Sequence, residues 1–121
     1  MQCSRYVRKP QDEYATVPFS SAEEVWFWFI RAHEASAAGA RARAGMALYP
    51  RPCEPVDVAR VVDRLYRQRR LLRDHLLVLA HYGRRLMAPN PDYRQEIKAS
   101  SLWREAFDRI EPALRSKGIV A

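Results

Sequence analysis

The chain has 121 residues, of which 48% are hydrophobic, and it carries a formal net charge of +7 at neutral pH. This length suits one domain with a buried core, and the hydrophobic content excludes an intrinsically disordered chain. The first five residues, Met1 to Arg5, are followed by charged residues and not by an apolar run, and there are only two cysteines, so we expect a cytoplasmic protein with no secretory signal and no disulfide framework.

The excess of positive charge comes almost entirely from arginine, which supplies 18 of the 21 basic residues. Proteins that bind phosphates carry such an excess, and the planar guanidinium suits phosphates and guanine edges better than the lysine ammonium does. A GC-rich genome would also raise the ratio of arginine to lysine, but it would not account for the net charge. The charge therefore makes nucleic acid the first class of partner to consider.

The N-terminal 19 residues show no periodicity and contain two prolines. They predict an extended N-terminal arm over residues 1–19, followed by a single helical domain over residues 20–121.

The helical domain opens with serines followed by glutamates, a pattern typical of a helix start. We expect the first helix to run from about Ser21 to Arg43. It begins with six consecutive large apolar residues, from Val25 to Ile30, which are too few to span a bilayer. A helix that is apolar all round should be central in the fold, with neighbours on most sides, unless one aromatic side contacts a partner.

A proline-rich connector, residues 49–55, separates this helix from residues 56–86. There, valines and leucines recur at i, i+3, i+4 and i+7, which predicts an amphipathic helix that opens at Pro55. The segment forms either one helix of about 30 residues or a pair that divides near Arg69, and ordinary helix lengths favour the pair.

Residues 88–92 have the composition of a turn, and a short helix should follow through Ile97. The last helix is expected to begin after a serine cap at Ser100 or Ser101 and to kink or restart at Pro112. Gly118 should end it, with the next residue folding back onto the last turn. The predicted fold is therefore an all-α, single-domain bundle of four to five helices.

The sequence shows no cluster of residues typical of an enzyme. The three histidines are dispersed, and there is no metal-binding, phosphate-loop or nucleophile motif. Cys53 lies between two prolines and could present a partly exposed thiol. We expect no catalytic residues, no cofactor and no metal site.

The basic residues are concentrated in one part of the chain. Between Arg60 and Arg85 there are eight arginines and two aspartates, a local net charge of +6. Arg60, Arg64 and Arg67 follow one another at i, i+4 and i+7, so they should form a charged ridge along one side of a helix. Such a ridge is either a solvated face or a surface that contacts phosphates or an acidic protein, which would relieve the repulsion among the arginines.

Three runs, Val58 to Leu65, Leu71 to Gly83 and Leu102 to Phe107, resemble helix-turn-helix regulators. The nearest groups are sigma-factor region 4 and the phage late-gene antiterminators. The resemblance covers about half of the chain. It implies that residues 72–82 form a supporting helix and residues 101–115 a reading helix in the major groove. Candidate base contacts would then be Arg104, Arg109 and Arg115.

We therefore predict a nucleic-acid-binding protein, a small transcriptional regulator or phage-type accessory factor, with DNA favoured over RNA. All predicted contact residues are arginines: Arg60, Arg64, Arg67, Arg69, Arg70, Arg73, Arg84, Arg85, Arg104 and Arg109. The alternative is a helical protein-protein interaction module or obligate dimer without a nucleic-acid role, with its interface at Trp26, Phe27 and Trp28. No membrane partner is expected.

Overall fold

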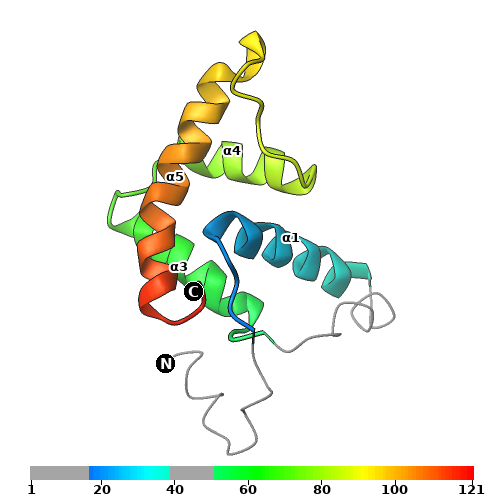
Figure 1. The fold of residues 1–121 in the computed structure, drawn as a ribbon, viewed down its shortest axis with the longest axis vertical. Helices are drawn as coiled ribbons and strands as arrows, with labels where there is room; N and C mark the ends of the chain where they lie inside the picture. The colour runs from blue at the N-terminus through cyan, green and yellow to red at the C-terminus, as the bar shows by residue number, and fades with distance from the viewer. Residues whose placement is uncertain (1–16, 39–50) are drawn as a thin grey trace, which may run out of the picture.

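The computed structural model describes residues 17–38 and 51–121, and it confirms the all-α prediction. Within these residues four α-helices form one bundle, and a short 3-10 helix, η3, precedes the last of them (Figure 1). The elements are α1 (Ala22–Ala38), α3 (Pro55–Arg67), α4 (Arg73–Arg84), η3 (Arg94–Glu96) and α5 (Ile97–Ser116). Within the described ranges there is no strand, and the only strand-like pairing is a single parallel bridge between Phe19 and Val120.

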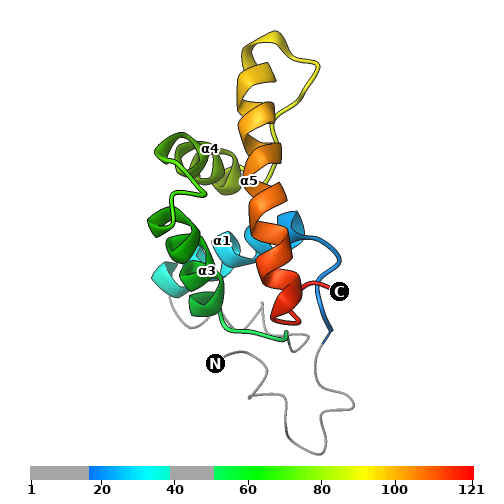
Figure 2. The same cartoon turned by 90° about the vertical axis from the view of Figure 1, so that its left-hand side faces the viewer.

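Each of two helices packs against all the other helices. α1 contacts α3, α4 and α5, as expected of a central aromatic-rich helix. α5 runs along the length of the molecule and contacts α1, α3 and α4 in turn. Figure 2 shows α3 and α4 one above the other beside α5, joined by a short turn. The arginine-rich part of the sequence is thus carried by two neighbouring helices.

The core includes the apolar stripe that the sequence predicted for the helix opening at Pro55. On α3 the buried residues are Val58, Val61 and Leu65, and on α5 they include Trp103 and Ile110. Burial of these side chains supplies most of the free energy that holds the helices together, since helix propensity alone contributes little.

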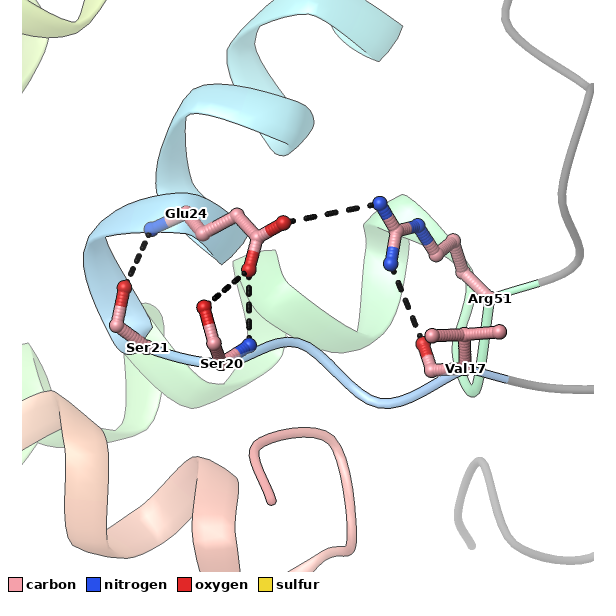
Figure 3. Close-up of polar contacts among 5 residues, drawn as sticks. All are labelled: Val17, Ser20, Ser21, Glu24 and Arg51. Carbon is pink, nitrogen blue, oxygen red and sulfur yellow. Dashed lines mark hydrogen bonds and ion pairs between the residues drawn. The ribbon is translucent and has the colours of Figure 1, made fainter.

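α1 begins with the serine and glutamate pattern seen in the sequence (Figure 3). The backbone N–H of Glu24 donates to Ser21 Oγ at 3.2 Å, and the Glu24 carboxylate accepts from the Ser20 N–H at 2.8 Å. Arg51 lies 3.8 Å from the same carboxylate and donates to the Val17 carbonyl at 3.2 Å. The part of the predicted helix beyond residue 38 lies outside the described residues.

The segment before α1 is part of the core. Phe19 is fully buried; its N–H donates to the Ile119 carbonyl, and its carbonyl accepts from the Ala121 N–H, both at 2.9 Å. Residues 1–16 of the predicted arm lie outside the described residues. The glycine at the end of α5 behaves as predicted: Gly118 has φ +78°, and Ile119 is buried against the last turn.

The beginning of the last helix differs from the prediction. η3 leads directly into α5 at Ile97, so Ser100 lies inside the helix and is buried rather than serving as its cap. The reason is a hydrogen bond ahead of the helix: Glu96 Oε1 accepts from the Asn90 N–H at 2.7 Å and closes the preceding loop. α5 also continues through Pro112 to Ser116, so of the two outcomes expected at that proline the restart is wrong, and the kink stays a prediction.

Candidate nucleic-acid interface

Eight of the predicted contact residues lie on α3, on α4 or beside their ends. We call them the basic surface: Arg60, Arg64, Arg67, Arg69, Arg70, Arg73, Arg84 and Arg85. All eight are exposed. The three on α3 stand opposite or beside the buried valines, so the ridge that they form faces solvent as predicted.

Most of these arginines make no ion pair with another described residue. Arg67 pairs with Asp63 at 3.1 Å and Arg60 with Asp57 at 3.8 Å, in both cases along α3. Arg85 lies over the Tyr82 ring, 5.9 Å from its centroid. The other five make no ion pair and no side-chain hydrogen bond in the part of the chain that the structure describes: Arg64, Arg69, Arg70, Arg73 and Arg84.

The turn between α3 and α4 is closed by two backbone hydrogen bonds. The Arg70 N–H donates to the Leu65 carbonyl at 2.9 Å and the Arg69 N–H to the Tyr66 carbonyl at 3.0 Å, the pattern of a Schellman motif. Arg69 has φ +63°, in the left-handed region where glycine is usual. Leu71 follows and is fully buried. The turn therefore presents two adjacent arginines on a backbone whose course is fixed, and it confirms that residues 56–86 form two helices.

A buried histidine joins the turn to α5. The Leu72 N–H donates to His75 Nδ1 at 3.0 Å, so the ring proton resides on Nε2, which donates to Glu105 Oε1 at 2.9 Å. This hydrogen bond is the main reason why the pKa of Glu105 lies below its usual value of 4.5. Arg109 donates to the Arg70 carbonyl at 3.1 Å, so α5 supports the turn at two points.

Sequence reasoning missed this arrangement for a physical reason. His75 occupies the third position of α4 and performs the capping role that glutamate or glutamine usually performs there, so the usual sequence pattern is absent. Its contact with Glu105 spans 30 residues and depends on how α4 and α5 pack. No local signal in the sequence could have predicted that contact.

The structure places the three candidate contacts on α5 differently from one another. Arg115 is exposed and is already paired with Glu111 at 2.9 Å. Arg104 is exposed and has no ion pair within the described residues, whereas Arg109 is partly buried and already bonded to the Arg70 carbonyl. The helix expected to support a reader corresponds to α4, and residues 85–96 connect it to α5. Arg109 thus belongs to the support of the turn.

The three aromatic residues considered for a partner interface pack within the protein. Trp26 is 8% exposed, and its Nε1–H donates to the Leu79 carbonyl at 2.9 Å. Phe27 lies against Trp103, with ring centroids 5.7 Å apart, and Trp28 lies 5.2 Å from the Phe19 ring. An interface role for these rings stays a prediction.

An open apolar pocket of about 280 Å³ lies between α1, α3 and α4. Its walls include Trp26, Phe29, Val62, Tyr66 and Leu76, and among the described residues Asp63 is the only charged one that lines it. A pocket with so few polar groups offers apolar contact area but no set of acidic, basic or nucleophilic side chains. It does not resemble a catalytic site.

The described residues contain no group of three or more metal-ligating side chains. Cys53 is buried, at 5% exposure, so the partly exposed thiol suggested by its flanking prolines is not present. None of the described helices is long and apolar enough to cross a membrane. Comparison with protein-family models, with curated proteins and with solved structures finds no match for this chain.

Proposed function

We propose that this protein binds nucleic acid, with duplex DNA favoured, through the basic surface, and that it acts as a small transcriptional regulator or phage-type accessory factor. The observation that carries the proposal is the set of exposed arginines on α3, α4 and their connecting turn that make no ion pair within the described residues. Residues 60–85 carry a local net charge of +6, and Asp57, which pairs with Arg60, is the acidic residue just before them that offsets part of it.

Electrostatics supports this choice of partner. Like charges on neighbouring turns repel one another, and a row of phosphates removes that repulsion while it releases condensed counterions from the nucleic acid. Guanidinium groups also bind phosphate oxygens in a bidentate manner, so the direction of the hydrogen bonds contributes to recognition in addition to the charge. The fixed turn at residues 68–72 favours binding further, because its arginines start from a backbone that need not be ordered on contact.

A pair of matched variants tests the proposal. One replaces Arg64, Arg70 and Arg73 of the basic surface by glutamine. The other replaces three exposed basic residues elsewhere, Arg31, Arg94 and Lys98, and so removes the same charge. Affinity is measured by fluorescence anisotropy with a random-sequence duplex of about 25 base pairs at low salt.

We expect the first variant to bind at least tenfold more weakly than the second, because phosphate contacts are lost at the surface that makes them. Equal losses in both variants would show that net charge alone attracts the duplex. Such a result would contradict the basic surface as the contact.

The apolar pocket between α1, α3 and α4 favours a second candidate function, that of a protein interaction module or dimer. Its exposed wall residue Tyr66 belongs to the aromatic class that is enriched at interfaces. Sedimentation equilibrium over a wide concentration range tests this function. A mass that rises with concentration and falls back in a Tyr66→Ala variant, together with no binding to nucleic acid, would favour this candidate over the first.

A further inference from the structure

We infer that α4, and not α5, is the helix that enters the major groove, with Leu77 and His81 facing the base edges and Arg73 and Arg84 contacting phosphates. This inference rests on the proposed function and names the part of the surface that would distinguish one DNA sequence from another. It departs from the assignment of residues 101–115 that the helix-turn-helix resemblance implied.

The first observation is the shape of α4 itself. Its inner side is buried through His75, Leu79 and Gly83, which recur every four residues. Its outer side carries Arg73, Leu77, His81 and Arg84, and all four are exposed. At 100° per residue, these four positions fall within a sector of about 80° of the helix circumference. α4 therefore has a continuous outward side that no other described element covers.

The second observation is the spacing of the charges on that side. Arg73 and Arg84 are eleven residues apart, which is about 16.5 Å along the helix axis. The major groove is about 12 Å wide and accepts one α-helix. Arginines near the two ends of α4 can therefore reach phosphates on the backbones that border the groove, while the middle of the helix faces the bases. Neither arginine has an ion pair within the described residues, so both are available.

The third observation concerns the side chains between them. Leu77 is 54% exposed, although it lies in the middle of a helix whose other leucines are more buried. An apolar side chain at this position matches the C5-methyl group of thymine, and the imidazole of His81 can donate to, or accept from, a base edge. Asp74 also faces solvent on the first turn; a carboxylate there favours the helix dipole and can accept from the cytosine N4 amino group.

α5 lacks these properties. It packs against α1, α3 and α4, and Arg109 is bonded to the Arg70 carbonyl. Its exposed and partly exposed positions also include Glu105, Asp108 and Glu111, which would repel phosphates. The acidic side chains near Arg104 and the position of α5 within the bundle both argue against insertion in a groove.

The test is a selection from a random-sequence duplex pool with four single variants of the full chain. Leu77→Ala and His81→Ala change the outward side of α4. Arg104→Ala and Asp108→Ala change exposed positions of α5 and serve as matched controls. Affinity for the unselected pool is measured in parallel, because it reports phosphate contacts and not base recognition.

We expect the unaltered protein to enrich a short motif. Each α4 variant should lose preference at its own position in the motif while its affinity for the unselected pool changes less than about threefold, and both α5 variants should keep the motif. In the selected duplex, replacing thymine by uracil should weaken binding by the unaltered protein roughly fourfold, the value of one buried methyl, and should not affect Leu77→Ala.

The inference would be overturned if the α5 variants changed the selected motif and the α4 variants did not. Salt-dependent binding to the pool with no enriched motif would also overturn it, and would leave the proposed function standing. Failure to bind the pool at low salt would contradict the proposed function itself, and the inference with it.

Discussion

Gly83 lies where α4 packs closely against side chains of α1. A Cβ atom built there would lie 2.7 Å from Trp26 Nε1 and 3.1 Å from Ile30 Cγ1. Trp26 cannot move away without losing its hydrogen bond to the Leu79 carbonyl. The absence of a side chain at this position is therefore what permits the two helices to meet.

We expect Gly83→Ala to lower the free energy of unfolding by about 1–3 kcal/mol, because the methyl group forces the helices apart. The effect opposes helix propensity, by which alanine would stabilise an ordinary helix by about 1 kcal/mol relative to glycine. Urea denaturation measures the change. Ser101→Ala on the exposed side of α5 serves as the control and should stay within about 0.5 kcal/mol of the unaltered protein. A Gly83→Ala protein that is more stable than the unaltered protein would show that the contact between α1 and α4 can accommodate a methyl group at residue 83.

Arg69 has a backbone conformation that does not suit its residue type. An L-residue in the left-handed region costs about 1–2 kcal/mol, which glycine avoids. Because glycine also loses more entropy on folding, we expect Arg69→Gly to raise the free energy of unfolding by only about 0.5–1 kcal/mol. The same variant should bind duplex DNA more weakly. A protein that is more stable and yet binds less well would indicate that arginine is present at this position for binding; unchanged binding would remove Arg69 from the basic surface.

The Glu105 carboxylate makes stability depend on pH. Its pKa in the folded protein lies below 4.5, chiefly because His75 donates a hydrogen bond to it, so the charged form is favoured on folding. Its contribution to stability is complete above about pH 4.5 and is lost as the pH falls through the lowered pKa. The pKa of Glu24 is lowered in the same direction, first by the Ser20 backbone N–H.

We expect the stability of Glu105→Gln to fall less steeply than that of the unaltered protein between about pH 5 and pH 3, because one titrating carboxylate is removed. Denaturant unfolding at several pH values measures the slope, and Glu34→Gln at an exposed position of α1 provides the comparison. Identical slopes for the unaltered protein and Glu105→Gln would rule out the hydrogen bond to His75 as a stabilising contact.

Among the elements, α1 is held to α4 by a buried tryptophan. Trp26 joins α1 to α4 through its hydrogen bond to Leu79 and stacks on Phe29, with centroids 5.2 Å apart. Trp26→Ala should cost about 3–5 kcal/mol. Trp26→Phe keeps most of the apolar area and should cost about 1–3 kcal/mol, the value of leaving the Leu79 carbonyl without its donor. Thermal unfolding compares the two. A folded Trp26→Ala protein of nearly full stability would place the ring at a partner interface instead.

The sequence predicts an element correctly where the residues that determine the element lie close together in the chain. The stripe of α3 and the glycine that ends α5 follow from residues within one or two turns, and both were predicted correctly. The division between α3 and α4 was predicted from helix length, but the left-handed Arg69 was not, because its residue type gives no signal there.

The prediction was wrong at the start of α5, where the loop that contains Asn90 contacts Glu96 and changes the boundary of the helix.

The candidate site likewise divides into features that depend on neighbouring residues and features that depend on contacts between distant ones. Exposure of the arginines follows from helical periodicity, so the basic surface could be predicted by residue. The role of Arg109 in supporting the turn could not be predicted, because it depends on the distance between α5 and a turn 39 residues earlier in the chain.

On the scale of the whole molecule, the protein is asymmetric in charge. Residues 60–85 carry a net +6 of the total +7, on α3, α4 and the turn that joins these two helices, which stand one above the other beside α5 (Figure 2). α1 and α5 supply the packing that holds these helices in place, while the arginines contribute little to that packing. This division of roles explains why the charge can be altered with little effect on the fold, which the variants above require.

The most direct measurement is a titration of a random-sequence duplex of about 25 base pairs with the unaltered protein. Fluorescence anisotropy of the labelled duplex reports binding, and the titration is repeated at several salt concentrations. If the basic surface contacts the backbone, we predict micromolar binding with a log–log salt slope of roughly −4 to −7, which corresponds to about five to eight neutralised phosphates. No binding at low salt, or binding that does not depend on salt, would contradict the account and would show that the arginines are only a solvated surface.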